Sequence, residues 1–240
     1  MAFIGLGGSV CGMEKTESPG VLYIVATPIG NMEDITLRAL RIMGEVDYVL
    51  CEDTRTTGNL CKHHGIKAKL KRYDAHASMA VHGAVVADLL AGQSVALVSD
   101  AGTPGVSDPG VMLVRQARVA GVRVDAVPGA SSITAAISIA GVSGNQFSFL
   151  GFVPSKKGRE TFFKDLELYD HPIVFLEATH RIIKTLKSLT ARYPTATLYL
   201  GRELTKLHEE MLVGTPAEVL EILTNTPVKQ KGEFVIVLSL

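Results

Sequence analysis

The sequence lacks several features that would point directly to one class of protein. Its 240 residues include no tryptophan and only three cysteines (Cys11, Cys51 and Cys61), and the formal net charge is zero. An odd number of cysteines without a paired spacing argues against a disulfide-rich secreted domain and fits a protein of the reducing cytoplasm. A neutral chain does not by itself indicate a nucleic-acid partner, because that indication rests on excess positive charge.

Signals for a membrane, for secretion and for a metal are also missing. No apolar run reaches the roughly 18 residues that a membrane-spanning helix needs. The glycine-rich residues 1–20 lack a basic segment before an apolar core, so they make a poor signal peptide and we expect a disordered extension. Cys61 lies close to His63 and His64, but adjacent histidines point to different faces and no second pair completes a tetrahedral site. We therefore expect neither a membrane anchor nor a bound metal.

The common nucleotide-binding motifs are absent as well. The chain has no Walker A loop, no nucleophile elbow and no GxGxxG that follows a strand. The glycines of residues 5–8 come before any predicted strand, so they do not form a dinucleotide-binding turn. These absences exclude the usual dinucleotide and nucleoside-triphosphate sites.

What the chain does have is a regular alternation of apolar runs and helical patterns. With 47% apolar residues it can bury a substantial core. In the first half, strands are predicted at 21–26, 46–52, 68–72, 94–99 and 122–127. Helices are predicted at 34–43, 54–64, 77–91, 110–120 and 131–140. This βαβ rhythm predicts an α/β fold with a parallel sheet flanked by helices.

A short, polar and glycine-rich break at 141–146 separates the two halves of the chain. We therefore predict an N-terminal α/β domain over 21–141 and a C-terminal α/β domain with a mixed sheet over 147–240. Strands of the second half are predicted at 147–152, 172–177, 195–201 and 232–239. Helices are predicted at 158–169, 180–192 and 215–224, and residues 205–213 are interpreted as a further strand or an irregular arm.

Three strand ends of the first half lead into loops rich in glycine, proline and small polar residues. These loops are TPIGN, SDAGTPGVSDPG and PGASS, at 27–31, 99–110 and 128–132. Open α/β sheets bind ligands at the carboxyl ends of their strands, where glycine lets the backbone approach a ligand closely. An ordinary strand–helix turn explains any one of the loops. All three together, with Asp100 at a strand end, favour a small-molecule site.

Positive charge gathers in two places although the total charge is zero. Residues 54–73 hold six basic side chains and no acid, and Lys156, Lys157 and Arg159 form a second cluster in a loop bounded by proline and glycine. Such clusters can contact phosphates, whereas a solvated surface is the commoner explanation of a charged run. Both interpretations stay open at this point.

Eight segments match one known family in order and spacing. They are LYIVATPIGNMEDITLRAL, EDTRTTGNL, VALVSDAGTPGVSDPG, VPGASSITAAISIAG, FLGFVPSKKGRE, FLEATHR, GRELTK and KGEFVIVL. Over residues 20–240 the chain resembles the tetrapyrrole-methylase-like superfamily of S-adenosylmethionine-dependent methyltransferases. In the corrin- and sirohaem-making members the first loop is usually a GxGPGD-like turn. The loop TPIGN and the strand end EDTR therefore favour the branch that modifies ribosomal RNA.

The resemblance implies two α/β domains with S-adenosylmethionine bound in the cleft between them, usually in a homodimer. The reaction that it implies is 2′-O-methylation of a cytidine ribose in the 16S rRNA of the small ribosomal subunit. Methyl transfer from a sulfonium is a direct displacement, so the enzyme needs a tight cleft that aligns the reactants more than it needs a protein nucleophile.

The matched segments place the candidate cofactor-binding residues at strand ends of both domains. The residues assigned to the cofactor are Pro28, Gly30, Asp100, Gly102, Thr103, Pro104, Ser107, Ser131, Ser132, Glu177, Ala178 and Thr179. An ordinary helix N-cap is the alternative role of Ser131. For the chemistry, Asp53 is the candidate base, and Arg55 or Lys206 is the candidate cation that stabilises charge on oxygen or binds phosphate. An Asp53–Arg55 pair that only locks its loop is an equally simple explanation.

Two other functions are weighed against this one. A methylase of a tetrapyrrole or another small molecule would share the cofactor site but need a roomy apolar pocket, and the TPIGN loop and the basic segment 54–73 argue against it. A non-catalytic RNA-binding or assembly factor would keep the fold without turnover, and the intact set of loops argues against that.

Overall fold

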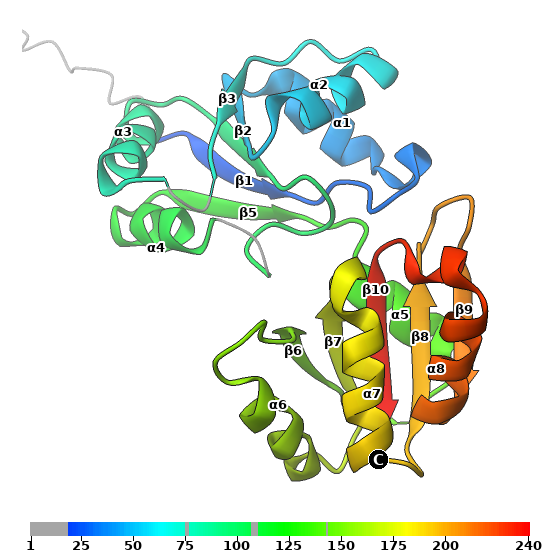
Figure 1. Cartoon of the computed structure of the whole chain (residues 1–240). Helices are drawn as coiled ribbons and strands as arrows, with labels where there is room; N and C mark the ends of the chain where they lie inside the picture. The colour runs from blue at the N-terminus through cyan, green and yellow to red at the C-terminus, as the bar shows by residue number, and fades with distance from the viewer. Residues whose placement is uncertain (1–18, 75–76, 107–109, 143) are drawn as a thin grey trace, which may run out of the picture.

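The computed structural model describes residues 19–74, 77–106, 110–142 and 144–240. They form two α/β units, each built on one five-stranded sheet, as the sequence predicted. Figure 1 shows the first unit, coloured blue to green, above the second unit, coloured green to red. Of the expected extension at 1–20 only residues 19 and 20 are described, and Ser107 lies outside the described residues.

The first unit contains a fully parallel sheet. Its strands are β1 Val21–Val25, β2 Tyr48–Cys51, β3 Leu70–Arg72, β4 Val95–Val98 and β5 Arg123–Val127, in the order β3-β2-β4-β1-β5. The helices that connect them are α1 Leu37–Glu45, α2 Thr54–His63, α3 Met79–Leu90 and α4 Val111–Val119. Each lies within the range predicted from the apolar pattern or within a few residues of it.

Alternate side chains of this sheet enter two separate cores. Leu50 packs in the core that contains Leu113 of α4, and its neighbour Val49 packs in the core that contains Ile42 of α1 and Leu60 of α2. Burying such a side chain contributes roughly 1.5–3 kcal/mol, so both faces of the sheet need a cover. Helices α3 and α4 cover one face, and α1 and α2 cover the other (Figure 1).

The order of the strands creates a crevice at the carboxyl end of β4. Strand β4 lies between β2 and β1. The loop after β4 leads to α4 on one face, whereas the loops after β1 and β2 lead to α1 and α2 on the opposite face. Loops that diverge in this way leave room between them, which is where open α/β sheets bind ligands.

The second unit contains a mixed sheet, as predicted. Its strands are β6 Ser148–Phe152, β7 Ile173–Glu177, β8 Thr197–Arg202, β9 Glu210–Gly214 and β10 Phe234–Ser239, in the order β6-β7-β10-β8-β9. Only β6 and β7 are parallel, and the other pairs are antiparallel. Residues 205–213, interpreted as a further strand or an irregular arm, contain an irregular turn that is followed by β9.

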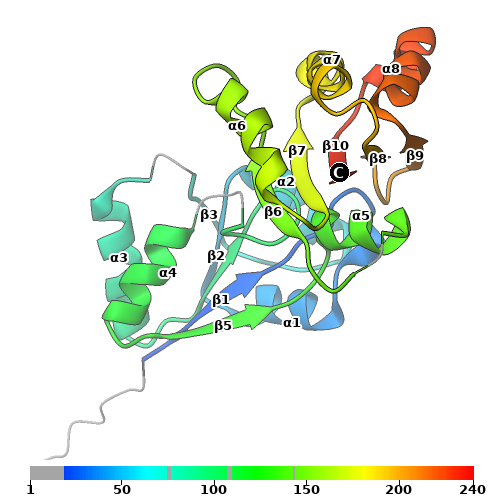
Figure 2. The same cartoon turned by 90° about the horizontal axis from the view of Figure 1, so that it is seen from below.

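Helices cover both faces of the second sheet. The helices on one face are α6 Arg159–Asp165, α7 Ile182–Arg192 and α8 Pro216–Asn225. Helix α5, Ser132–Ala140, covers the other face, where its Ala136 and Ala140 pack with Val174 and Val237 (Figure 2). Although α5 follows β5 of the first sheet, it belongs to the core of the second unit. This packing favours a domain boundary before α5, near residues 128–131, over the expected boundary at 141–146.

Candidate functional site

The loops after β1 and β4 are joined by backbone hydrogen bonds. Thr27 and Gly102 each donate an amide to the other's carbonyl, at 2.9 and 3.1 Å, and the Thr27 hydroxyl donates to the carbonyl of Ser99 at 3.0 Å. Gly102 has a φ of +80°, in the left-handed region that favours glycine. These contacts hold the first and second of the predicted site loops side by side.

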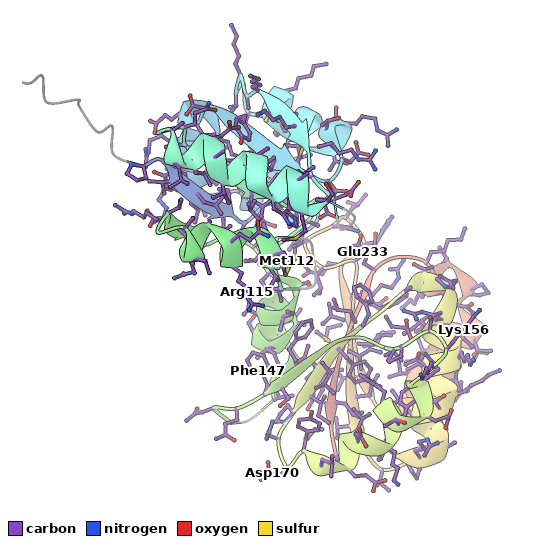
Figure 3. All side chains as sticks on the ribbon, turned by 90° about the vertical axis from the view of Figure 1, so that its left-hand side faces the viewer. Met112, Arg115, Phe147, Lys156, Asp170 and Glu233 are labelled. Carbon is purple, nitrogen blue, oxygen red and sulfur yellow. The ribbon has the colours of Figure 1, made fainter. Side chains whose placement is uncertain are left out.

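A cluster of charged side chains in the second unit lies at the mouth of the crevice. The Lys206 ammonium pairs with the carboxylates of Glu203 and Glu233 at 3.0 and 3.3 Å, and Glu203 also accepts a hydrogen bond from the amide of Glu233. Figure 3 shows Glu233 at the junction of the two units. The cluster fixes the turn before β10 against the turn after β8.

The turn after β8 contains two non-glycine residues in the left-handed region of backbone conformation. Glu203 has a φ of +50° and Thr205 a φ of +65°. Such conformations cost on the order of 1–3 kcal/mol each and persist where the surrounding contacts enforce them, commonly at functional sites. The Glu203–Lys206–Glu233 cluster supplies those contacts here.

A cavity of about 540 Å³ lies between the two units. Its volume falls in the range of small-molecule sites, roughly 300–1,000 Å³. Eight residues expected from the sequence line it: Asp100, Gly102, Thr103, Ser131, Ser132, Glu177, Ala178 and Thr179. The structure therefore brings together strand-end loops of the first unit and the end of β7 in the second.

Sequence reasoning missed most of the apolar wall of this cavity. Ile29, Phe152, Leu176, Leu204 and Val235 line it, together with the acids Glu52 and Glu233. Each of these residues lies inside a segment that the resemblance quoted, and Ile29, Glu52 and Leu176 are next to a residue that was selected. Position beside a strand end was the signal that could have found them.

A second cavity of about 210 Å³ adjoins the first. Pro28 and Gly30, both expected at the cofactor site, line this smaller cavity together with Thr56 and Thr57 of α2. Ile29, Asp100 and Ala101 line both cavities. Asp100 is thus the one expected acid, among the described residues, that faces both spaces.

Four of the described candidates line neither cavity: Asp53, Arg55, Pro104 and Lys206. Lys206 stays close to the site, because a Cβ placed on Gly30 would lie 2.4 Å from its Cγ. Burial works against the charge of Lys206, but the hydrogen bond to Glu203 and the carboxylate of Glu233 raise its pKa above the ordinary value. The side chain therefore remains a cation, which suits charge stabilisation and not proton abstraction.

Asp53 is held by Arg55 at the start of α2. The Arg55 guanidinium lies 2.6 Å from the Asp53 carboxylate, which also caps the helix by accepting a hydrogen bond from the amide of Arg55. The side-chain and backbone hydrogen bonds from Arg55 lower the pKa of Asp53 to about 2. A carboxylate with so low a pKa is a weak base. The geometry supports the loop-lock interpretation of this pair.

The Asp53 pair has a measurable pH signature. The pKa of Asp53 is lowered in the folded protein, so the stability that it adds is present above the ordinary value of 3.8 and is lost as pH falls toward about 2. Asp53→Asn should therefore have a lower urea midpoint than the wild type at pH 6, and the difference should shrink as the pH falls through about 2. A difference that grows as the pH falls would contradict this assignment.

Glu177 is buried, and its carboxylate is used inside the protein. The side chain is 0% exposed, and it pairs with Arg181 at 2.7 Å and with Arg159 at 3.5 Å. The Thr185 hydroxyl and the Ala178 amide also donate to it. Glu177 therefore acts on the cavity by holding the wall at Ala178 and Thr179 in place, not through an open carboxylate.

Ser131 occupies the N-cap position of α5 without making the side-chain hydrogen bond of a cap. Its hydroxyl is not used by the helix, and the residue lines the large cavity together with Ser132. The first amides of a helix have no partner within the helix and favour a negative group. This corner of the cavity suits the carboxylate of a ligand.

Two further observations concern the described residues alone. No helix within them is long and apolar enough to cross a membrane. They also contain no cluster of three histidine, cysteine or acidic side chains with the geometry of a metal site. Cys51 and Cys61 are buried free thiols.

Comparison with known proteins agrees with this geometry. The sequence profile of the Tetrapyrrole (Corrin/Porphyrin) Methylases matches residues 21–220. A protein of Neisseria meningitidis named ribosomal RNA small subunit methyltransferase I is 45% identical over 220 residues, which cover 91% of this chain and 76% of that protein. A protein of Leptospira biflexa with the same name is 44% identical over 232 residues, which cover 95% of this chain and 94% of that protein.

Solved structures share the fold at lower identity. Diphthine synthase superposes with a TM-score of 0.71 at 17% identity and covers 92% of this chain and 90% of its own. Uroporphyrin-III-C-methyltransferase of Thermus thermophilus superposes with a TM-score of 0.63 at 22% identity, and the match covers 91% of this chain and 94% of that chain. The profile match and the close relatives show that this chain is an enzyme of the tetrapyrrole methylase family.

Proposed function

We propose that this enzyme transfers a methyl group from S-adenosylmethionine to the ribose 2′-hydroxyl of a cytidine in the 16S rRNA of the small ribosomal subunit. The observation that carries the proposal is the cavity between the units, lined by the strand-end loops of a chain 45% identical to a ribosomal RNA small subunit methyltransferase I. By the same resemblance we expect a cytoplasmic homodimer. Light scattering in solution tests the dimer, because a monomeric mass would contradict it.

The residues of the large cavity suit S-adenosylmethionine. Apolar side chains such as Ile29, Leu204 and Val235 offer a surface for the adenine ring, and acids such as Glu233 can accept hydrogen bonds from ribose hydroxyls or from the amino group. The free hydroxyl of Ser131 and the start of α5 can hold the carboxylate. When bound, the cofactor supplies a methyl group activated by a positively charged sulfur.

The chain's own residues then have to hold the acceptor oxygen in line with the methyl group and the sulfur, and they have to accept the proton of the hydroxyl. Asp100 lines both cavities, so a ribose that enters the smaller cavity meets this carboxylate at the boundary with the larger one. We therefore prefer Asp100 over Asp53 for the proton-accepting role, because Asp53 lines neither cavity and has a pKa near 2. Lys206 remains the candidate cation beside the first loop.

The direct test uses labelled S-adenosylmethionine and small ribosomal subunits from cells that lack this enzyme. We expect label at one cytidine whose 3′ linkage resists alkaline cleavage, because a methylated 2′ oxygen cannot attack the neighbouring phosphate. Asp100→Asn should slow transfer about 10²–10⁴-fold even at saturating cofactor, so that a change in the Kd for the cofactor does not account for the loss. Label on a tetrapyrrole and none on the subunits would instead identify a small-molecule methylase. Cofactor-independent binding of subunits without transfer would identify an assembly factor.

A further inference from the structure

The basic segment 54–73 is the sequence feature that the cofactor site does not explain. It holds six basic side chains and no acid in a chain whose net charge is zero. In the structure it forms α2, the connection at 64–69 and β3, the edge strand of the first sheet. The segment therefore lies along one outer edge of the first unit (Figure 1).

Three lysines of this segment differ from the other basic residues. Lys62, Lys67 and Lys69 are exposed, and none has an ion-pair partner among the described residues. The other three basic residues are paired: Arg55 with Asp53, Lys71 with Asp88, and Arg72 with Asp74. The three lysines are thus free to bind an external anion.

Helix α2 connects these lysines to the site. Thr56, Thr57 and Leu60, on its inner side, line the smaller cavity. Lys62 lies in its last turn, and the helix is about 15 Å long. The C-terminal end of α2 is also tied to the turn directly after the first loop, because His64 hydrogen-bonds the carbonyl of Met32 at 3.1 Å. A chain that leaves the smaller cavity along α2 passes the lysines.

The composition of this surface favours a nucleic acid over a protein. None of the large apolar side chains exposed on the described residues lies between residues 54 and 73. Protein interfaces have cores that are rich in aromatic and apolar side chains and depleted in lysine. Backbone phosphates, in contrast, are contacted by lysines without regard to base sequence.

We infer that Lys62, Lys67 and Lys69 form a docking surface for RNA backbone phosphates next to the nucleotide in the site. The inference rests on the proposed function, because it takes the polyanion to be the RNA substrate. The lysines hold the strand in position and do not contact the reacting atoms. Lys156, in the second basic cluster, lies on the second unit and is not part of this surface (Figure 3).

The test compares two triple variants that remove the same charge. Lys62→Ala/Lys67→Ala/Lys69→Ala removes the proposed surface, and Lys164→Ala/Lys184→Ala/Lys187→Ala removes three exposed lysines of α6 and α7 in the second unit. Binding of small ribosomal subunits is measured from 50 to 200 mM salt. Binding to a single strand releases about 0.7 counterions per contacted phosphate. The loss of three contacts should therefore make the affinity depend less steeply on the salt concentration. The wild type should then lose about 20-fold more affinity than the first variant over this range.

The controls separate this inference from the proposed function. Binding of S-adenosylmethionine should be the same in both variants and in the wild type, and the second variant should keep the wild-type salt dependence. An unchanged salt dependence in the first variant, or an equal loss in both variants, would overturn the docking surface. Absent methyl transfer by the wild type would instead overturn the proposed function, so the two failures are distinguishable.

Discussion

Replacing Glu177 by alanine is expected to lower the free energy of unfolding by about 3–5 kcal/mol. The Glu177 side chain is 0% exposed and pairs with Arg159 and Arg181, whose side chains are only 6% and 16% exposed. Removing the carboxylate leaves two guanidinium groups with little water and no negative partner in this network. Urea unfolding followed by circular dichroism measures the loss.

A matched variant shows that burial, not charge alone, causes this effect. Glu160 pairs with Arg192 in the same unit, but its side chain is 79% exposed. Glu160→Ala should therefore cost only about 0–1 kcal/mol, as exposed ion pairs do. Equal losses in the two alanine variants would show that the Glu177 network adds no more than a surface pair.

A third variant separates the positioning role of Glu177 from its role in stability. Glu177→Gln keeps the shape of the side chain but removes the negative charge and replaces one acceptor oxygen by an NH2 donor. We expect a folded protein with a higher Kd for S-adenosylmethionine, because Ala178 and Thr179 line the cavity directly after the altered residue. An unchanged Kd in folded Glu177→Gln would limit Glu177 to a structural role.

The sequence predicted the strands and helices well because their signals are local. The parallel strands of the first sheet are buried on both faces, so β2 and β4 appear as short apolar runs between turn residues. The position of α5 was not predictable in the same way. Its sequence SITAAISIA is apolar enough to pack on either sheet, and only the three-dimensional arrangement places it on the second.

The candidate site was predictable as a set of loops but not as a set of contacts. The strand-end rule and the resemblance located Asp100, Ser131 and Thr179, which all line the large cavity. The partners of Glu177 could not be found from the pattern, because Arg159 lies 18 residues away in another element. Pairing partners of this kind depend on how two segments meet, which neither spacing nor periodicity encodes.

The second large expected effect concerns the contact between the first loop and the turn after β8. Gly30→Ala should lower kcat/KM about 100-fold. An added Cβ would lie 2.4 Å from Lys206 Cγ, 2.9 Å from Thr205 Oγ1 and 3.0 Å from the carbonyl oxygen of Leu204. Carbon atoms in contact lie about 3.5–4.0 Å apart, so one loop must move by about 1 Å. A misplacement of this size costs on the order of 10²-fold in rate.

Position 30 needs glycine because the neighbouring turn leaves no room for a Cβ atom, and not because of the backbone conformation. Gly30 is absent from the residues with a positive φ, so alanine can adopt its backbone angles. Its neighbours Ile29 and Leu204 pack in one core and both line the large cavity, so separating the loops displaces the cavity wall. Gly83→Ala in α3 is the matched control. Apart from the backbone of its own helix, no described atom lies near its added Cβ, so kcat/KM should stay at the wild-type value.

A double variant identifies the contact responsible. Lys206→Ala removes the Cγ atom that the new Cβ approaches most closely. Lys206→Ala has its own cost as the loss of the candidate cation, so the comparison is between the effects of Gly30→Ala in the two backgrounds. We expect the added methyl group to cost about tenfold less when Lys206 is alanine. An equal cost in both backgrounds would place the clash on the two other close atoms, Thr205 Oγ1 and the carbonyl oxygen of Leu204.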